Sequence, residues 1–333
     1  MQKSISVVIP NYNGIDLFKI NLPPLYKALQ KSSINYEIII VDDASKDNSI
    51  DFLRQYYPDI IVIINENNMG FSTTMNRGIY AAKNDLVLSL NSDVVLTEDY
   101  FSPLFRYFDD PNTFAVAGKV IGLHDDTIQD TAKYPNCSMG NISGTTNYKI
   151  INYLPNTKTI GMPSLFTSGA NTLYDREKLV FVEGFTELYS PYYGEDLDLS
   201  IKAWRMGWRS YYEGKAICRH QTSITIKKYN RPRKIRIITK RNKLIMHFTH
   251  LGGREWLIFL GKTIFKLLFS WVKLDFIYYI AFKKFLMMIP QVIDLRKNMR
   301  SKAQGINKDL IPLRSVVSEM QKEIQSLGNI ELF

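Results

Sequence analysis

Short apolar runs alternate with stretches of helical spacing along the first 90 residues. Each run is five residues long and rich in Val, Ile or Leu, which is typical of strands buried on both faces of a parallel sheet. Between the runs, apolar residues recur at the spacing of three to four expected for helices. The sequence therefore predicts an α/β fold with a doubly wound, mainly parallel sheet and helices on both faces. The expected strands span 5–9, 37–41, 60–64 and 86–90, and the expected helices span 17–30, 49–57 and 72–82.

Polar segments follow three of these runs directly. They are PNYNG at 10–14, DDASKD at 42–47 and NSD at 91–93. Ligands of doubly wound sheets bind beyond the carboxyl ends of the strands, so we expect these segments to form one site at one rim of the sheet. Residues 124–165 are rich in Asn, Thr, Gly and Pro and have no clear period, and we expect them to form a long loop beside that site.

Two side chains in these segments suit a nucleotide. The ring of Tyr12 can stack on a nucleobase, and the carboxylate of Asp43 can accept hydrogen bonds from a base N–H or from ribose hydroxyls. The same spacing equally fits a turn in which Asp42, Asp43 and Ser45 cap the following helix. Both interpretations stay open on spacing alone.

Asp93, at the end of the fourth run, can supply a hard oxygen ligand to a Mg²⁺ or Mn²⁺ ion that bridges a diphosphate. His220 follows a strand-like run at 215–218 and is a candidate second ligand. A single His is more often structural than metal-binding, so the residue type alone leaves both roles open.

Residues 194–206 are expected to form a helix with acids in its first turn. Asp196 can act as a general base for an attacking hydroxyl group. Acids at this position also stabilise a helix through its dipole, by about 0.3 to 1 kcal/mol each, which is the simpler explanation. The neighbouring aromatic rings can stack on sugars or belong to the core. The candidates on the acceptor side are Glu195, Tyr193 and Trp208.

Taken together, these motifs resemble family 2 glycosyltransferases of the GT-A fold, particularly the bacterial branch that builds rhamnose-containing or related surface polysaccharides. The resemblance runs from Val7 to about Asn242 and includes IPNYNG, VDDASKD, LNSDV, EGF, YGEDLDLSIKAWRMGWR and RHQTS. It implies an inverting, metal-dependent transfer of a sugar from dTDP-rhamnose or a UDP-sugar. The implied acceptor is a hydroxyl of a glycan or of a polyprenyl-linked carrier.

The resemblance also assigns roles to individual residues. It implies that Asp196 is the catalytic base and that Asp93 and His220 hold Mg²⁺ or Mn²⁺. The donor-binding residues that it implies are Pro10, Tyr12, Asn13, Asp43, Gly70, Asn76 and Ser92. The chain departs from the family pattern twice, because D-x-D is NSD at 91–93 and G-G-F-D-E is EGFTE at 183–187. The donor contact of the missing Asp therefore has no counterpart here.

Basic residues are concentrated towards the C-terminus. Residues 227–300 contain 18 Lys or Arg and three acids, a local balance of +15 within a net charge of +10. Residues 256–289 are very apolar apart from lysines, and if they form one helix, most of those lysines share one side: Lys262, Lys266, Lys273 and Lys284. Such a helix fits the interface of an anionic membrane, or a helix docked on the catalytic domain with its lysines in water. Residues 309–327 are expected to form a further helix.

We therefore expect a nucleotide-sugar-binding and catalytic domain over 1–230 and a basic, apolar helical segment over 231–333. The sequence begins without a signal peptide pattern, and Cys137 and Cys218 lie far apart. These features predict a cytoplasmic protein, peripheral on the inner face of the cell membrane, without a nucleic-acid partner. The oligomeric state is left open.

Two other function classes were weighed. A nicotinamide-dependent oxidoreductase needs G-x-G-x-x-G after the first strand, and here that turn is NYNG at 11–14. A nonenzymatic membrane or nucleic-acid binding protein fits the basic segment but leaves the acidic motifs unexplained.

Overall fold

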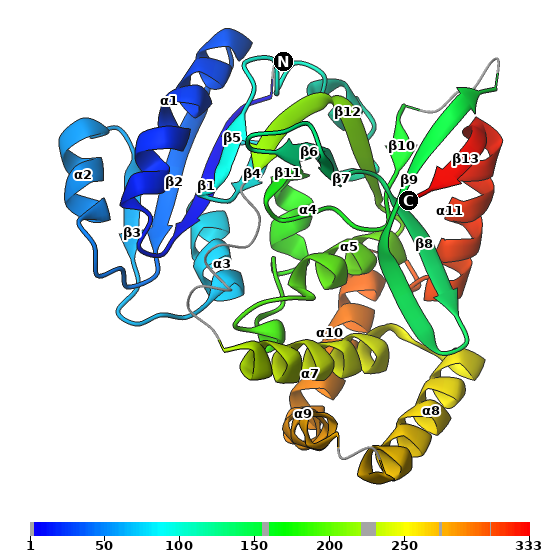
Figure 1. Cartoon of the computed structure of the whole chain (residues 1–333). Coiled ribbons are helices and arrows are strands. Elements are labelled where there is room, and N and C mark those ends of the chain that lie inside the picture. Colours follow the sequence, from blue (N-terminus) through cyan, green and yellow to red (C-terminus); the bar gives the residue numbers. More distant parts are fainter. Residues whose placement is uncertain (1–2, 155–159, 221–230, 273–274, 307) are drawn as a thin grey trace.

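The computed structural model describes residues 3–154, 160–220, 231–272, 275–306 and 308–333 (Figure 1). Its first part is a set of parallel strands in the spatial order β3-β2-β1-β4, joined by helices. The elements are β1 (Ile5–Asn11), α1 (Ile15–Ser32), β2 (Tyr36–Asp42), α2 (Ser49–Tyr56), β3 (Ile61–Ile64), α3 (Phe71–Ala81) and β4 (Leu86–Leu90). All strands and helices predicted here are confirmed, with ends that differ by at most two residues.

Alternate residues of the strands pack against helices on opposite faces of the sheet. Val7 belongs to a buried cluster with Phe18 of α1, whereas Val8 belongs to a cluster with Met75 and Ile79 of α3. A Cβ added to Gly78 of α3 would lie 2.3 Å from a methyl group of Val8, so a glycine lets α3 lie directly on β1. Helices α4 (Arg176–Phe181) and α5 (Glu195–Arg205) contribute to the same face as α3.

Beyond β4 the sheet is mixed, so the expectation of a mainly parallel sheet is wrong for this half. β11 (Asn171–Asp175) runs antiparallel to both β4 and β6 (Thr113–Gly122), and β12 (Arg209–His220) runs parallel to β6. Buried apolar runs do not indicate strand direction, which explains the error. The remaining strands here are β5 (Val94–Leu96), β7 (Ile128–Asp130) and β10 (Met162–Pro163), and the 3₁₀ turns are Phe105–Asp109 and Glu187–Tyr189.

The predicted long loop at 124–165 is also wrong. Most of it is a β-hairpin of β8 (Lys133–Ser138) and β9 (Asn141–Tyr153), extended by β13 (Gly328–Leu332). Its turn residues Met139 and Gly140 both have positive φ, as tight hairpin turns require. The hairpin packs against α11 (Leu313–Leu327) and α8 (Gly253–Val272) rather than forming part of the cavity described below.

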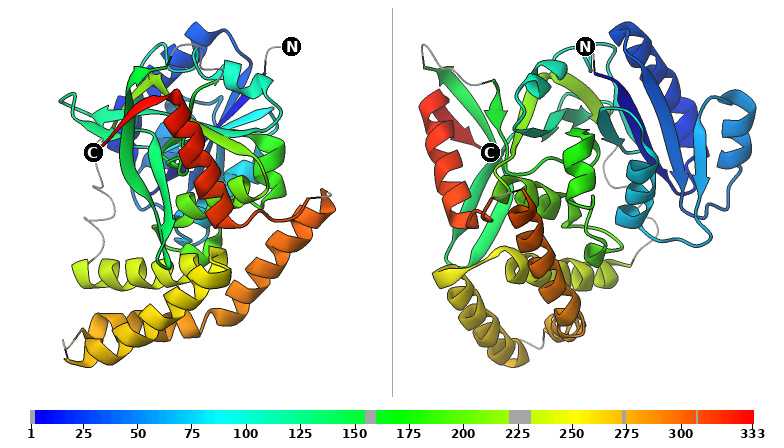
Figure 2. Two further views of the ribbon diagram at one scale, coloured as in Figure 1. Left: turned by 90° about the vertical axis from the view of Figure 1, so that its right-hand side faces the viewer. Right: turned by 180° about the vertical axis from the view of Figure 1, so that it is seen from behind.

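Of the C-terminal helices, those over residues 232–286 lie below the sheet, whereas α11 stands beside the hairpin (Figure 2). The C-terminal helices are α7 (Pro232–His250), α8 (Gly253–Val272), α9 (Phe276–Leu286), α10 (Ile289–Gly305) and α11. Residues 256–289 are not one continuous helix, because α9 starts anew at Phe276 with Asp275 accepting a hydrogen bond from the Tyr278 amide. The tail helix predicted at 309–327 is present as α11.

A shared hydrophobic core joins these helices to the part that contains the large sheet. Ile201 and Trp204 of α5 cluster with Ile245 of α7 and Met320 of α11. In the described chain no helix is by itself long and apolar enough to cross a bilayer; α9 and α10 meet that requirement only together and are bent by 57°.

Candidate active site

A cavity of about 530 Å³ opens at the carboxyl ends of β1, β2 and β4, a size suited to a small-molecule ligand. The three polar segments that follow these strands all contribute to its wall, as expected. The cavity also receives the N-terminus of α5 and the end of β12. Candidate residues lining it are Pro10, Tyr12, Asp43, Gly70, Ser92, Asp93, Tyr193, Glu195, Asp196 and His220.

Sheet pairing brings Asp93 and His220 together. Asp93 immediately precedes β5, and His220 at the end of β12 pairs with Val94 in the antiparallel β5–β12 ladder. His220 Nε2 lies 3.4 Å from Asp93 Oδ1, and both side chains are largely buried. No hydrogen bond among the described residues satisfies Asp93 Oδ1. Residues 127 positions apart in sequence therefore present one carboxylate oxygen and one imidazole nitrogen to the same point.

Gln129 of β7 orients the ring of His220. The Gln129 side-chain amide donates to the His220 carbonyl oxygen at 3.1 Å, which orients its own oxygen towards His220 Nδ1, also at 3.1 Å. In this arrangement Nδ1 faces the amide oxygen of Gln129, and Nε2 is the ring nitrogen that faces Asp93. Nothing in the spacing of the sequence signalled this role for Gln129.

Asp93 and His220 fit a hard divalent cation such as Mg²⁺ or Mn²⁺. Carboxylate oxygen and neutral imidazole nitrogen are ligands that Mn²⁺ accepts, and the unsatisfied Asp93 Oδ1 needs a positive partner. Among the described residues no group of three or more His, Cys, Asp or Glu side chains is arranged to hold a metal. Other oxygen atoms, such as those of a diphosphate, would have to complete the coordination.

Asp196 lies in the first turn of α5, next to Glu195. Burial raises the pKa of both carboxyl groups above their ordinary values, and for Glu195 the charge of Asp196 adds to this effect. Oδ1 of Asp196 is buried without a hydrogen bond among the described residues. A Cβ at Gly169 would lie 2.7 Å from this oxygen, so the SGA segment at 168–170 needs glycine to admit the carboxylate. The result is a carboxylate that holds a proton more readily than an ordinary Asp.

Asp43 lines the cavity, but both of its oxygens are already engaged by the protein. Oδ1 accepts from the Met69 amide at 2.7 Å and from the Asn65 side chain at 2.8 Å, and Oδ2 accepts from the Gly70 amide at 2.9 Å. Asp42 caps its own turn by accepting from the Ser45 amide. The carboxylate of Asp43 therefore shapes the loop at 68–70, and it keeps lone pairs that can still face a ligand.

Comparison with known proteins places the chain in a family. The model of Glycosyl transferase family 2 matches residues 6–181, more than half of the sequence. The chain belongs to glycosyl transferase family 2. It is similar to the chondroitin synthase of Pasteurella multocida, with 23% identity over 224 residues that cover 61% of this chain and 23% of that protein. The chain spans between 19% and 42% of the length of curated relatives that it matches.

Solved structures share the fold of this family 2 chain. A structure of GalNAc-T7 with UDP, GalNAc and Mn²⁺ aligns with a TM-score of 0.61 and 15% identity, covering 98% of this chain and 58% of that one. S. aureus TarS 1–349 in complex with UDP-GlcNAc aligns with a TM-score of 0.54 and 17% identity, covering 96% and 92%. At these identities the likeness shows the GT-A fold of the neighbours and nothing finer.

Three residues proposed for the site lie elsewhere in the family 2 fold. Asn13 has positive φ and accepts from the Lys46 amide, so it shapes the turn after β1. Asn76 is buried and holds the 183–185 turn through both the amide and the carbonyl of Phe185. Trp208 stacks on Phe114 of β6, with 6.1 Å between ring centroids, and belongs to the buried cluster between the sheet and α5. None of the three lines the cavity.

Lys234 lines the cavity without having been predicted, whereas Tyr192 is one of the aromatic rings expected beside Asp196. Lys234, near the start of α7, brings a positive charge to the cavity wall, and its only signal in the sequence was the general basicity of its segment. The loop bearing Pro191 and Tyr192 forms another part of the wall. Asn242 of α7 holds that loop by donating to the Tyr192 carbonyl at 2.9 Å and to that of Tyr193. Residues 221–223, the end of the RHQTS motif, lie outside the described residues.

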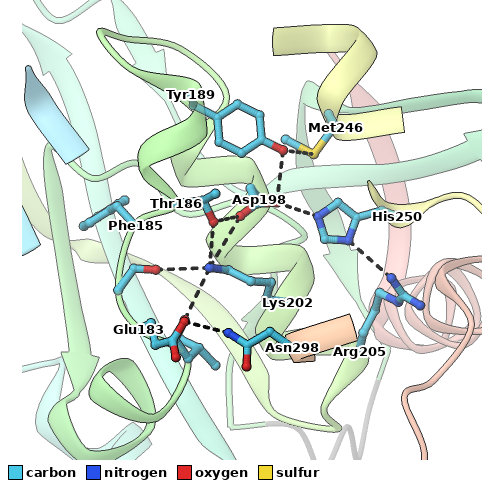
Figure 3. Close-up of polar contacts among 12 residues, drawn as sticks. Glu183, Phe185, Thr186, Tyr189, Asp198, Lys202, Arg205, Met246, His250 and Asn298 are labelled. Carbon is cyan, nitrogen blue, oxygen red and sulfur yellow. Dashed lines mark hydrogen bonds and ion pairs between the residues drawn. The ribbon is translucent and has the colours of Figure 1, made fainter. Parts of the chain in front are cut away.

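A buried polar network lies behind the acidic turn of α5 (Figure 3). Asp198 accepts hydrogen bonds from the hydroxyl groups of Thr186 and Tyr189, and its Oδ2 lies 3.5 Å from Lys202 Nζ. Burial alone would raise the pKa of Asp198, but the charge of Lys202 and the hydrogen bonds outweigh it and hold the pKa well below its usual range. Thr186, which stands where the family pattern has an Asp, thus belongs to this network.

His250 connects the network to α7. Its Nε2 lies 2.7 Å from Asp198 Oδ1, and its Nδ1 lies 3.4 Å from Arg205 Nη1. Burial lowers the pKa of His250, so the ring is neutral at pH 7, donates to Asp198 and accepts from Arg205. The network therefore ties α5, which carries Asp196, to the first of the C-terminal helices.

Proposed function

We propose that this chain is an inverting glycosyltransferase that moves a sugar from a nucleoside-diphosphate sugar to a hydroxyl of a glycan or lipid-linked acceptor. The observation that carries the proposal is that Asp93, His220 and Asp196, from three distant segments, line one cavity at the carboxyl ends of the strands. Lys234 adds a positive charge to the same wall. A diphosphate, a cation and an attacking hydroxyl group each find matching chemistry there.

The chemical step follows from these residues. Asp196 accepts the proton of the acceptor hydroxyl, whose oxygen forms a bond to the anomeric carbon. The bond between that carbon and the phosphate oxygen breaks on the opposite face, and its electron pair leaves with the nucleoside diphosphate. Asp93 and His220 would hold the divalent ion, which neutralises charge on the leaving diphosphate when bound. The raised pKa of Asp196 makes it a stronger base than an ordinary carboxylate.

The relatives support a role in polysaccharide synthesis. They include a chondroitin synthase and a poly-β-1,6-N-acetyl-D-glucosamine synthase, and solved neighbours contain UDP, UDP-GlcNAc or GDP-Man. We propose dTDP-rhamnose or a UDP-sugar as the donor. A nonenzymatic binding protein is not favoured, since family membership and the acidic cavity both point to transfer chemistry.

Donor binding is tested by thermal unfolding of the full chain with a panel of dTDP-, UDP- and GDP-sugars, with and without Mn²⁺. A ligand that binds only the folded state raises the unfolding temperature by mass action. We expect one nucleotide class to stabilise the protein in a Mn²⁺-dependent way and to be cleaved to the nucleoside diphosphate. Equal curves for every donor, with no cleavage, would refute the proposal.

The variant Asp93→Asn tests the assignment of Asp93 as a metal ligand. The variant should lose both Mn²⁺-dependent stabilisation and release of nucleoside diphosphate, because the amide removes the charge that holds the cation. Asp51→Asn, an exposed position on α2, is the matched control and should behave like the wild type. Retention of Mn²⁺-dependent cleavage by Asp93→Asn would contradict the assignment.

A further inference from the structure

The outward side of α8 is apolar and uncovered. Its exposed side chains include Leu257, Ile264, Phe265, Leu268 and Phe269, each between 47% and 67% exposed. At 100° per residue these positions fall within an arc of about 140° on one side of the helix. We call these five residues the apolar face. Soluble proteins rarely leave such a continuous apolar stripe in water without a function.

The opposite side of α8 is docked on the protein. Phe259 is buried in the core cluster, and Lys262 Nζ donates to the Met139 carbonyl of the hairpin at 2.7 Å. Lys266 Nζ lies 4.5 Å from the centre of the Tyr278 ring of α9. Both lysines are exposed beside the apolar face, and their ammonium groups contact the hairpin and α9. Lys273, which was grouped with them, lies outside the described residues.

Helices α8 and α9 form the outermost layer of the molecule on the side of α7, at the bottom of Figure 1 and of both views in Figure 2. α9 adds further exposed apolar residues at its two ends, Phe276 at 53% and Met287 at 70%. α8 is 20 residues long, about 30 Å at 1.5 Å per residue. An elongated helix that is docked along one side and apolar along the other is suited to lying in an interface.

The surroundings of the apolar face are positively charged. Residues 231–306 contain three acids: Glu255 is buried and accepts from the Gly140 amide, Asp275 pairs with Lys240 at 3.0 Å, and Asp294 is exposed, 3.9 Å from Lys297. Many basic side chains of the same helices are exposed, among them Arg233, Lys234, Arg236, Lys243, Arg254, Lys283 and Lys284. Two copies with this charge would repel one another, whereas an anionic surface is complementary to it.

We propose that the apolar face inserts into the interface of an anionic membrane, with the basic residues of α7 to α9 on the lipid headgroups. This docking deepens the proposed function and rests on it. Lys234 belongs to the basic helix and also lines the cavity, so the cavity has one wall on the side of the membrane. A hydroxyl acceptor carried on a lipid would then enter from that side. Apolar insertion combined with Lys and Arg contacts is how interfacial helices bind anionic bilayers.

The test is co-sedimentation of the full chain with vesicles, without donor or metal. Wild-type protein should pellet with vesicles of phosphatidylglycerol and phosphatidylcholine, and much less with phosphatidylcholine alone. The double variant Phe265→Glu, Leu268→Glu should bind the anionic vesicles on the order of tenfold more weakly. Ile20→Glu is the control, since Ile20 is a 57% exposed apolar residue on α1, and it should pellet like the wild type.

Several outcomes would overturn the proposal. They are no pelleting of the wild type with either vesicle, equal pelleting with both, or equal pelleting of wild type and double variant. Thermal unfolding of each variant without lipid confirms that it is folded. Mn²⁺-dependent cleavage of the donor in solution separates the two proposals, because the double variant should keep this activity. If the wild type cleaves the donor but does not bind vesicles, only the membrane proposal is refuted. If the wild type cleaves no donor, the proposed transferase function is refuted.

Discussion

Replacing Asp198 with Asn tests how the site is supported from behind. Its side chain is 0% exposed, and the Lys202 side chain beside it is 4% exposed. The substitution removes the negative charge that compensates Lys202 and replaces one of the two oxygens that accept from Thr186, Tyr189 and His250 with an amide donor. Breaking a buried ion pair by removing one partner costs about 3 to 5 kcal/mol. We expect the free energy of unfolding of Asp198→Asn to fall by about that amount.

The pH dependence of this loss has a definite sign. The folded protein holds the pKa of Asp198 below its ordinary value, so the ionised carboxylate favours the folded state above the unfolded-state pKa of about 4. That contribution is lost as the pH falls through the folded-state pKa. The difference in stability between wild type and Asp198→Asn should therefore be full at pH 7 and shrink below pH 4.

Urea unfolding at pH 7 and at pH 3.5 measures both effects. Glu319→Gln, which changes an exposed acid in the middle of α11, is the control and should stay within about 0.5 kcal/mol of the wild type. A loss below about 1 kcal/mol for Asp198→Asn at pH 7 would refute the idea that this network holds α5 and α7 together.

Three further predictions concern the cavity itself. Gln129→Ala should weaken Mn²⁺ affinity about 10- to 100-fold, because it releases the His220 ring. The affinity is measured by titrating Mn²⁺ and following the thermal stabilisation of the protein by the nucleotide, and an unchanged titration contradicts the prediction. Gly169→Ala should displace the Asp196 carboxylate and lower kcat by about tenfold or more while nucleotide affinity is kept, so an unchanged kcat contradicts that contact. Asp196→Asn should unfold at a higher temperature than the wild type at pH 8 but not at pH 4. The raised pKa means that the ionised Asp196 carboxylate destabilises the folded state, and this cost is present at pH 8 and absent at pH 4. An equal rise in unfolding temperature at both pH values contradicts this.

The parallel half of the sheet was predictable because its signal is local. Continuous apolar runs such as those of β1 and β4 are characteristic of buried strands. Because the carboxyl ends of parallel strands lie at the same rim of the sheet, residues 10–14, 42–47 and 91–93 were expected together there. The adjacency of Asp93 and His220 rested instead on the family resemblance. Only the register of β5 against β12 explains it physically.

The remaining fold depends on pairings between distant segments. β9 also pairs with β13, about 180 residues further along the chain, and no local pattern of residues 124–165 indicates that pairing. Trp208 closely follows the helix that carries Glu195 and Asp196, and its position in sequence does not distinguish a sugar-stacking ring from a core ring. Gln129 acts through a single side-chain contact with His220 that has no motif. The start of α9 could have been predicted from Asp275, because Asp often occupies the position directly before a helix.

The central claim is that Asp196 takes the acceptor proton in a cavity that binds donor independently of that carboxylate. It is tested by measuring donor affinity by calorimetry and sugar transfer in the same preparations of wild type and Asp196→Asn, once the donor panel has identified the nucleotide. Donor affinity should stay within about threefold, and transfer should fall by 10² to 10⁴, the contribution typical of a general base. Transfer at the wild-type rate by Asp196→Asn, with donor bound equally well, would contradict the account.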